Sequence, residues 1–239
     1  EMTGTISKRD MTEQVLDSNP NEKERGITIK LAPVRMKWKE YILNLIDTPG
    51  HVDFSYEVSR SLAACEGVIL VVDSTQGVQA QTLAYMQQVV KRNLKVIPVI
   101  NKIDLPIANV SETKEQMMQA FGFNKDEFIE ISGKTGKNVE ILLSEIIKRI
   151  PPPSDNSSKP IRMLVFSSFY EPHRGVVCFV KVVDGEFTYN PNSKLRFMAS
   201  NNSFLPVETG YFSPKMVRSI SLKTGEVGYV ATGLKDIHQ

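Results

Sequence analysis

Residues 96–104 read VIPVINKID. The first five residues are an apolar run of strand length, which is typical of a parallel strand covered on both faces. Asn101, Lys102 and Asp104 follow directly, where the strand is expected to end. Because open parallel sheets bind ligands beyond the carboxyl ends of their strands, this stretch predicts an α/β domain with a ligand site at that edge.

The same alternation continues on both sides of this stretch. Apolar strands are predicted over residues 41–46, 68–72 and 128–131, and amphipathic helices over 55–64, 78–92, 112–121 and 139–150. In the second of these helices, core spacing is found at Leu83, Met86, Val89 and Val90. Strands that alternate with helices lie parallel, so a mostly parallel sheet is predicted, with the run over 68–72 buried on both faces.

The composition changes after the last predicted helix. Residues 151–160 combine four prolines with small polar residues and fit neither a helix nor a central strand, so they are interpreted as a linker. Beyond it, short strands over 176–183, 195–198 and 227–231 are separated by turn signals, which predicts a small all-β barrel or sandwich. The predicted domains are 1–153, a linker over 154–160, and 161–239.

The overall composition excludes several classes of protein. Lys and Arg number 29 and Asp and Glu number 27, so the net charge of +2 gives no global signal for a nucleic-acid partner. Hydrophobic residues make up 41% and charged residues 23%, which excludes disorder over the whole chain. Cys65 and Cys178 are far apart in apolar surroundings and are interpreted as reduced thiols. No apolar run is long enough to span a bilayer.

The residues after the strand over 96–100 have the chemistry that distinguishes guanine from adenine. The carboxylate of Asp104 can accept two hydrogen bonds from a purine only if the ring offers N1–H and an exocyclic amino group, as guanine does. The stem of Lys102 would lie over the ring, and Asn101 would tie loops together. A solvated loop is the alternative interpretation, because an Asn-Lys-x-Asp string alone occurs often by chance.

Two further polar groups follow predicted strands. Ser132, Gly133 and Lys134 follow the strand over 128–131, and small residues there would let a backbone N–H reach the base oxygen. Alone, this group is better explained as a polar turn before a helix. The second group follows the strand over 41–46 and consists of Asp47, Pro49, Gly50 and His51.

The residues after the strand over 41–46 allow two interpretations. Asp47 could hold Mg²⁺ through water, and Gly50 would let a backbone N–H approach a phosphate oxygen. The alternative is a strand-to-helix turn in which Asp47 is a cap. His51 could orient an attacking water or could cap the next helix. Because the three polar groups end three of the candidate strands around one crevice, together they predict a guanine-nucleotide site.

The phosphate-binding part of such a site is incomplete in the sequence. The hydroxyl of Thr28 could join a Mg²⁺ shell if its loop closes over a γ-phosphate, or Thr28 could be an ordinary β-former. No Gly-x-x-x-x-Gly-Lys-Ser/Thr stretch, which cradles phosphates, is found anywhere. Either that loop lies upstream of Glu1 in a longer parent, or the chain is not a working GTPase.

Together these motifs resemble those of the translational GTPases, and most closely the LepA (elongation factor 4) family. The generic motifs are Arg25-Gly26-Ile27-Thr28, Asp47-Thr48-Pro49-Gly50-His51, Asn101-Lys102-Ile103-Asp104 and Ser132-Gly133-Lys134. The family-specific stretches are residues 14–18, 51–67, 79–82, 150–153 and 225–229. The resemblance implies a P-loop-type GTPase domain without its first strand and phosphate loop, followed by a β-barrel that docks on the small ribosomal subunit.

The resemblance also implies GTP or GDP and Mg²⁺ as cofactors. Thr28 and Asp47 would bind Mg²⁺, and Gly50 would sense the γ-phosphate beside Pro49. His51 would be the catalytic residue, which positions the hydrolytic water once the ribosome engages. Guanine would be bound by Asn101, Lys102, Ile103, Asp104, Ser132, Gly133 and Lys134. Gly133 replaces the alanine usual in the family, which predicts a looser loop.

The implied function is that of a ribosome-associated GTPase acting in translation elongation. A truncated, non-catalytic ribosome-binding module is the alternative. The implied partners are a guanine nucleotide and the ribosome, through its RNA and small-subunit proteins. Weak peripheral association with a membrane is also implied, and nothing indicates a homo-oligomer. The implied location is the bacterial cytoplasm, with the mitochondrial matrix as the alternative.

Overall fold

The computed structural model describes residues 2–7, 9, 15, 16, 22, 24 and 28–235. Residues 14, 17, 18 and 25–27 of the motifs quoted above lie outside the described residues. The chain divides into a first compact unit, Glu1–Pro49 with Pro153–Gln239, and a second compact unit, Gly50–Pro152. None of the described helices is long and apolar enough to cross a membrane.

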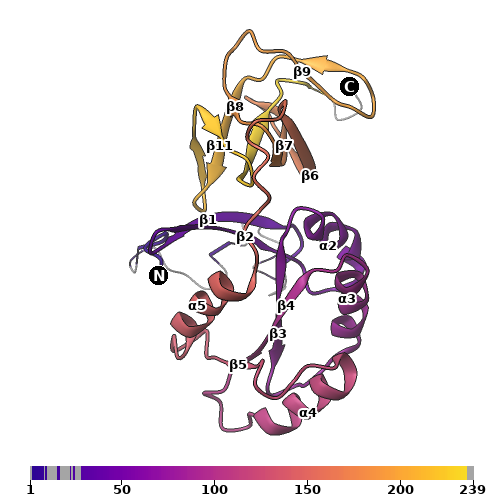
Figure 1. The fold of residues 1–239 in the computed structure, drawn as a ribbon, viewed down its shortest axis with the longest axis vertical. Coiled ribbons are helices and arrows are strands. Elements are labelled where there is room, and N and C mark those ends of the chain that lie inside the picture. The colour runs from indigo at the N-terminus through magenta and orange to yellow at the C-terminus, as the bar shows by residue number, and fades with distance from the viewer. Residues whose placement is uncertain are drawn as a thin grey trace. The chain divides into compact units, whose positions relative to one another are not determined.

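The second unit is built on a three-stranded parallel sheet with helices packed on it (Figure 1). Its elements are η1 (Val52–Phe54), α2 (Ser55–Leu62), β3 (Gly67–Asp73), α3 (Ala80–Lys91), β4 (Lys95–Asn101), α4 (Val110–Phe121), β5 (Ile129–Glu130) and α5 (Val139–Arg149). The strand order is β3-β4-β5, and both neighbouring pairs are parallel. The parallel arrangement predicted for these three strands is therefore confirmed.

The middle strand, β4, fills the core on both faces of the sheet. Ile100 is fully buried and packs in a cluster with residues of α2, α3 and α4. Val99 is also fully buried and belongs to a second cluster with Leu142 of α5. Because successive residues of a strand point to opposite faces, a strand between two helical layers needs the unbroken apolar run seen over residues 96–100.

Three apolar side chains that were predicted to be buried are exposed instead. Val71 of β3 is 53% exposed, and Leu83 and Val90 of α3 are 43% and 69% exposed. β3 is an edge strand among the described residues, so Val71 lacks the neighbour that a central strand would provide. On α3, Met86 and Val89 alone take fully buried positions, which makes the core stripe narrower than the sequence pattern suggests.

The first unit contains a two-stranded hairpin. Its strands are β1 (Ala32–Trp38) and β2 (Tyr41–Asp47), which pair antiparallel. This pair is antiparallel, whereas β3, β4 and β5 of the second unit are parallel, so the prediction of a mostly parallel arrangement applies to the second unit. Lys39, with a φ of 55°, begins a two-residue connection, and such tight turns return a strand antiparallel to the one before. The guanidinium of Arg35 lies 4.2 Å from the ring centroid of Tyr211, which joins the hairpin to the later strands of this unit.

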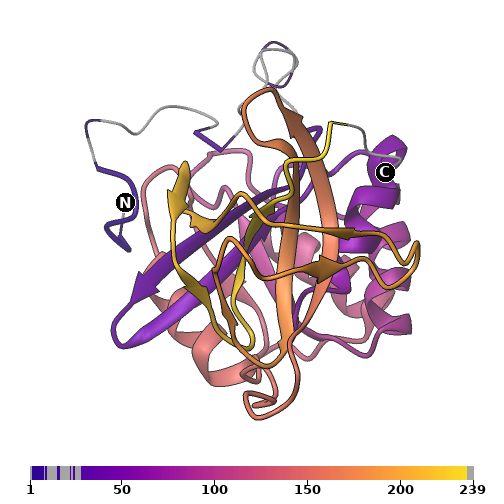
Figure 2. The same cartoon turned by 90° about the horizontal axis from the view of Figure 1, so that it is seen from above.

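Those later strands form a five-stranded antiparallel sheet in the order β12-β11-β14-β7-β6, with two short ladders, β10-β9 and β13-β8. The strands are β6 (Arg162–Glu171), β7 (Gly175–Asp184), β8 (Phe187–Thr188), β9 (Leu195–Arg196), β10 (Ser203–Phe204), β11 (Glu208–Phe212), β12 (Met216–Arg218), β13 (Ser221–Leu222) and β14 (Val227–Ala231). The long pair β6–β7 runs side by side in Figure 2 (orange). Gly185, with a φ of 70°, lies in the bend after β7, and the next strand, β8, pairs with β13 and not with β7.

A buried carboxylate links the strands of this sheet. Glu208 is 5% exposed, and it accepts hydrogen bonds from Tyr229 Oη at 2.5 Å, Arg218 Nε at 2.7 Å and Arg174 Nε at 3.1 Å. Burial alone would raise the pKa of Glu208, but the three donors outweigh it, so the pKa lies below its usual range. Because both carboxylate oxygens of Glu208 accept hydrogen bonds, its negative charge is stabilised inside the unit.

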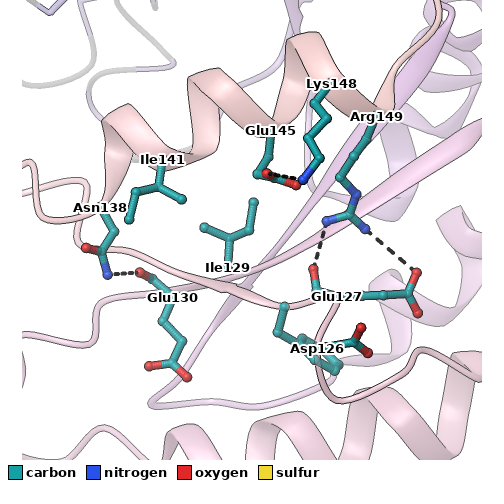
Figure 3. A pocket seen from close by; sticks show the side chains of 10 residues that line it. Asp126, Glu127, Ile129, Glu130, Asn138, Ile141, Glu145, Lys148 and Arg149 are labelled. Atoms are coloured by element: carbon teal, nitrogen blue, oxygen red, sulfur yellow. Dashed lines mark hydrogen bonds and ion pairs between the residues drawn. The ribbon is translucent and has the colours of Figure 1, made fainter.

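A hollow of about 420 Å³ lies beside β5 in the second unit (Figure 3). Asn138 Nδ2 donates to the carbonyl of Glu130 at 2.8 Å, and Arg149 Nη1 donates to the carbonyl of Glu127 at 2.9 Å. Unpaired strand edges are templates for pairing with other chains, so the bond to Glu130, the last residue of β5, covers part of the outer edge of that strand. None of the predicted site residues lines this hollow.

Candidate functional site

The sheet of the second unit brings the ends of its strands together. Asp73, the last residue of β3, is paired in register with Asn101, the last residue of β4. Ile100 is paired with Glu130, the last residue of β5. The loops that begin after residues 101 and 130 therefore start at one edge of the sheet, where parallel sheets bind ligands.

Asn101 connects these two loops through its side chain. Its Oδ1 accepts the backbone N–H of Lys102 at 2.7 Å and the backbone N–H of Gly133 at 3.0 Å. Its own carbonyl accepts from the N–H and the hydroxyl of Ser74, at 3.0 and 2.8 Å. Asn101 thus fixes the loop after β4 to its neighbours on both sides.

Asp104 is exposed and is held by the second loop. A hydrogen bond from the side chain of Ser132 lowers the pKa of the Asp104 carboxyl below its usual range, and the charge of Lys134 adds to that effect. Ser132 is fully buried, and its hydroxyl oxygen also accepts the N–H of Thr135 at 3.0 Å. The Asp104 carboxylate therefore stays ionised to a lower pH than usual, and it is exposed to solvent.

Lys102 has the left-handed backbone conformation, with a φ of 64°. That conformation costs a residue other than glycine about 1–2 kcal/mol, so it persists only where neighbouring contacts hold it. Lys102 Nζ lies 2.7 Å from Asp73 Oδ2. The hydrogen bonds from Lys102 and Thr75 outweigh the burial that would raise the pKa of Asp73, so that pKa lies below its usual range.

Ile103 anchors the same loop to the core. It packs partly buried against the cluster that contains Ile100 and Met117, and its N–H donates to the carbonyl of Ile131 at 3.4 Å. The apolar position inside an otherwise polar motif thus keeps the loop close to the sheet.

Sequence reasoning did not assign Asp73, Ser74 or Thr75 to the site. Asp73 caps the turn after β3, because its Oδ1 accepts from the N–H and the hydroxyl of Thr75 at 2.9 and 2.8 Å. The ion pair with Lys102 comes in addition. The position of Asp73 could have indicated that it belongs to the site, because Asp73 ends its strand as Asn101 ends the neighbouring strand.

His51 lies at the start of η1, and its backbone is more firmly held than its side chain. Its carbonyl accepts from the hydroxyl of Tyr85 at 2.5 Å and from the N–H of Phe54 at 3.1 Å. The imidazole is 43% exposed, and its Nδ1 accepts the N–H of Asp53 at 3.3 Å. The contact that the capping interpretation expects is therefore present, while the ring remains open to solvent.

The residues predicted to bind Mg²⁺ belong to the first unit. Asp47 ends β2 opposite Ala32, Thr28 is half-buried, and Pro49 is buried. Gly50 begins the second unit and is exposed, with open space where a side chain would start. Within the described residues, no group of three His, Cys, Asp or Glu side chains is arranged to hold a metal. The side chains that the structure brings together at the sheet edge therefore come from the residues at, or just after, the ends of β3, β4 and β5.

The prediction that Gly133 makes the loop after β5 looser can be tested by substitution. A Cβ there would lie 3.7 Å from Asn101 Oδ1, an ordinary contact, and the residue has no left-handed φ. We expect Gly133→Ala to raise the free energy of unfolding by about 0.4–1 kcal/mol, because the unfolded chain loses conformational freedom. Denaturant titration measures this change.

A matched control is Gly77→Ala in the same unit. Gly77 has a φ of 68°, and a Cβ there would collide with the side chain of Gln116, so this variant should be destabilised. Destabilisation of Gly133→Ala as well would show that the loop after β5 is tighter than its contacts indicate.

The comparisons with known proteins agree with this geometry. The family model described as "Elongation factor Tu GTP binding domain" matches residues 1–152. Elongation factor 4 of Dehalococcoides mccartyi is 49% identical over 99% of this chain and 40% of its own length. The chloroplastic translation factor GUF1 homolog of Vitis vinifera is 48% identical over 99% of this chain and 35% of its own length.

A solved structure shows the same fold. The bacterial selenocysteine-specific elongation factor EF-Sec superposes with a TM-score of 0.76 at 23% identity, covering 99% of this chain and 41% of that chain. The chain spans about 40% of the length of the elongation factor 4 relatives it matches. The predicted resemblance to elongation factor 4 is confirmed by these relatives. The chain belongs to the family of the elongation factor Tu GTP binding domain.

Proposed function

We propose that the protein is a ribosome-associated translational GTPase of the elongation factor 4 class. The observation that carries this proposal is the pair of loops after β4 and β5. They hold the ionised carboxylate of Asp104 beside Ser132, and Asn101 joins them by accepting the N–H of Gly133 at 3.0 Å. This arrangement supplies the acceptor that guanine needs and adenine cannot match. The elongation factor 4 relatives support the same class.

The residues present fit a guanine base. A carboxylate that accepts from both N1–H and the exocyclic amino group gains two charge-assisted hydrogen bonds, and it would remain unpaired against adenine. Lys102 would place its stem along one face of the ring. Ser132, Gly133 and Lys134 would present backbone N–H groups to the base oxygen. GTP, when bound, supplies the phosphoryl group whose transfer to water is the reaction.

The phosphate side of the site is assigned from the motif residues. Thr28 and Asp47 would hold Mg²⁺, which offsets the negative charge of the phosphates when bound. Pro49 would turn the chain so that the N–H of Gly50 meets the γ-phosphate. His51 would orient the attacking water. Hydrolysis would therefore rely on positioning and charge stabilisation rather than on a covalent intermediate.

The proposed domains are a GTPase domain over 1–153, a linker over 154–160 and a β-barrel over 161–239. We also propose that the parent protein carries a further strand and the phosphate loop before Glu1. The edge position of β3 and its 53% exposed Val71 support this, because a neighbouring parallel strand would cover them.

The proposed partners are a guanine nucleotide and the ribosome, through its RNA and small-subunit proteins. Elongation factor 4 relatives come from bacteria, and one relative is named as chloroplastic, so we place the protein where ribosomes of the bacterial type work. We also propose weak peripheral contact with a membrane. The alternative location is the mitochondrial matrix. No second copy of the chain is part of the proposal.

The test is nucleotide turnover by the intact protein that contains this sequence. We expect hydrolysis of GTP but not of ATP, with a clear increase when ribosomes are added. The fragment 1–239 alone should show negligible turnover, because it lacks the phosphate loop. Ribosome binding by the intact protein without any GTP hydrolysis would instead favour the non-catalytic module.

A further inference from the structure

The turn after β3 lies directly beside the loop after β4, which carries Lys102 and Asp104 and is proposed to bind the base. Asp73, Ser74 and Thr75 form this turn, which is called the 73–75 turn below. Ser74 is 2% exposed, and its N–H and hydroxyl both donate to the carbonyl of Asn101 at 3.0 and 2.8 Å. The turn is therefore fixed to the backbone at the end of β4, without any contribution from the side chains of the loop after β4.

The two carboxylate oxygens of Asp73 have different partners. Oδ1 accepts from the N–H and the hydroxyl of Thr75, which fixes the orientation of the carboxylate within the turn. Oδ2 faces Lys102 Nζ at 2.7 Å. The Asp73 side chain is 19% exposed and that of Lys102 is 51% exposed, so the acceptor is sheltered while the lysine stem remains open to a ligand.

Lys102 is consequently held at both ends. Its N–H donates to Asn101 Oδ1 at 2.7 Å, and its Nζ is paired with Asp73, so the aliphatic stem between them has a fixed direction. A free lysine side chain would have to be ordered when a ligand arrives, and that ordering weakens binding. An anchored stem removes part of this entropic cost in advance.

We propose that Asp73 is a positioning residue for nucleotide recognition, which anchors Lys102 Nζ so that the lysine stem is set in place against the face of the guanine ring. This inference rests on the proposed function. Asp73 would not touch the nucleotide itself. It would therefore affect how tightly and how long a guanine nucleotide stays bound, and it would leave the choice of guanine to Asp104.

The test uses Asp73→Asn in the intact protein. The amide keeps an oxygen for Thr75 but loses the charge that faces Lys102. We expect GDP, measured as a fluorescent analogue, to bind roughly 5–10-fold more weakly and to dissociate correspondingly faster, a modest effect because the pair is partly exposed. Preference for GDP over ADP should be unchanged. Raising the salt concentration should narrow the difference from the unmodified protein, because salt screens the ion pair.

Two further variants separate anchoring from a purely structural role. In a Lys102→Met background, Asp73→Asn should have no additional effect on GDP dissociation, since the partner is already gone. Thr75→Val removes the hydroxyl contact but keeps the backbone N–H that orients the Asp73 carboxylate, together with the ion pair, so it should dissociate GDP at nearly the normal rate.

Several outcomes would overturn the inference. An equal loss of affinity from Asp73→Asn with and without Lys102 would show that Asp73 acts only through the turn, as would a loss from Thr75→Val of the same size. Normal GDP binding by Asp73→Asn would overturn the anchoring role alone. An unmodified protein that binds no GDP would overturn the proposed function and this inference with it.

Discussion

Asp104→Asn is expected to weaken binding of GDP by the intact protein on the order of 100-fold and to improve binding of xanthosine diphosphate. The carboxylate accepts from two donors on guanine, whereas an amide presents one donor and one acceptor. Xanthine carries an oxygen where guanine carries its amino group, so the amide can donate to it. Competition of each nucleotide against a fluorescent analogue measures both affinities.

Asp126→Asn is a suitable control, because Asp126 is also an exposed carboxylate of the second unit but lines the hollow beside β5. That variant should bind GDP normally. Retained guanine preference in Asp104→Asn would show that Asp104 does not read the base. Equal loss of both nucleotides would indicate that the variant disturbs the loop rather than its specificity.

The pKa of Asp104 adds a pH dependence to the same prediction. The hydrogen bond from Ser132 holds that pKa below the usual range of an aspartate. A carboxylate with a lowered pKa stays charged as the solution is acidified, and it loses its charge only when the pH falls through the lowered value. Recognition of guanine should therefore persist below the pH at which an ordinary aspartate becomes protonated.

Burial explains which elements could be predicted from the sequence. β4 lies between two helical layers, so both of its faces are buried and its sequence is a continuous apolar run. The predicted strand over 96–100 falls within the observed Lys95–Asn101. β6 was missed, because Arg162–Glu171 mixes exposed, half-buried and buried positions without strict alternation. Val71 was predicted to be buried, because an apolar run does not reveal whether its strand has one neighbour or two.

The candidate site divides in a similar way. The link from Asn101 to the loop after β5 was expected, because the ends of neighbouring parallel strands meet at one edge. The pairing of Lys102 with Asp73 was not expected. It depends on the register that places Asp73 beside Asn101 and on the left-handed backbone of Lys102, and no sequence spacing encodes either. Ion pairs between loops 29 residues apart need a three-dimensional fold before they can be recognised.

His51→Ala is expected to leave GTP affinity of the intact protein within about twofold while it slows ribosome-stimulated hydrolysis by roughly 100-fold or more, the range for a positioned group that handles a proton or water. The imidazole is 43% exposed and contributes little to the core. The contact with Tyr85 uses the backbone carbonyl of His51, and alanine keeps that carbonyl. The segment should thus keep its place while it loses the ring.

Single-turnover hydrolysis with saturating ribosomes measures the effect, and equilibrium titration with a non-hydrolysable GTP analogue measures affinity. His173→Ala is the matched control, because His173 is likewise an exposed histidine but lies between β6 and β7 in the first unit. Unchanged stimulated turnover in His51→Ala would leave the ring a local structural role, such as its capping contact with the N–H of Asp53. A large loss of GTP affinity would instead assign His51 to binding, so the separation of affinity from turnover is the result that identifies a water-positioning role.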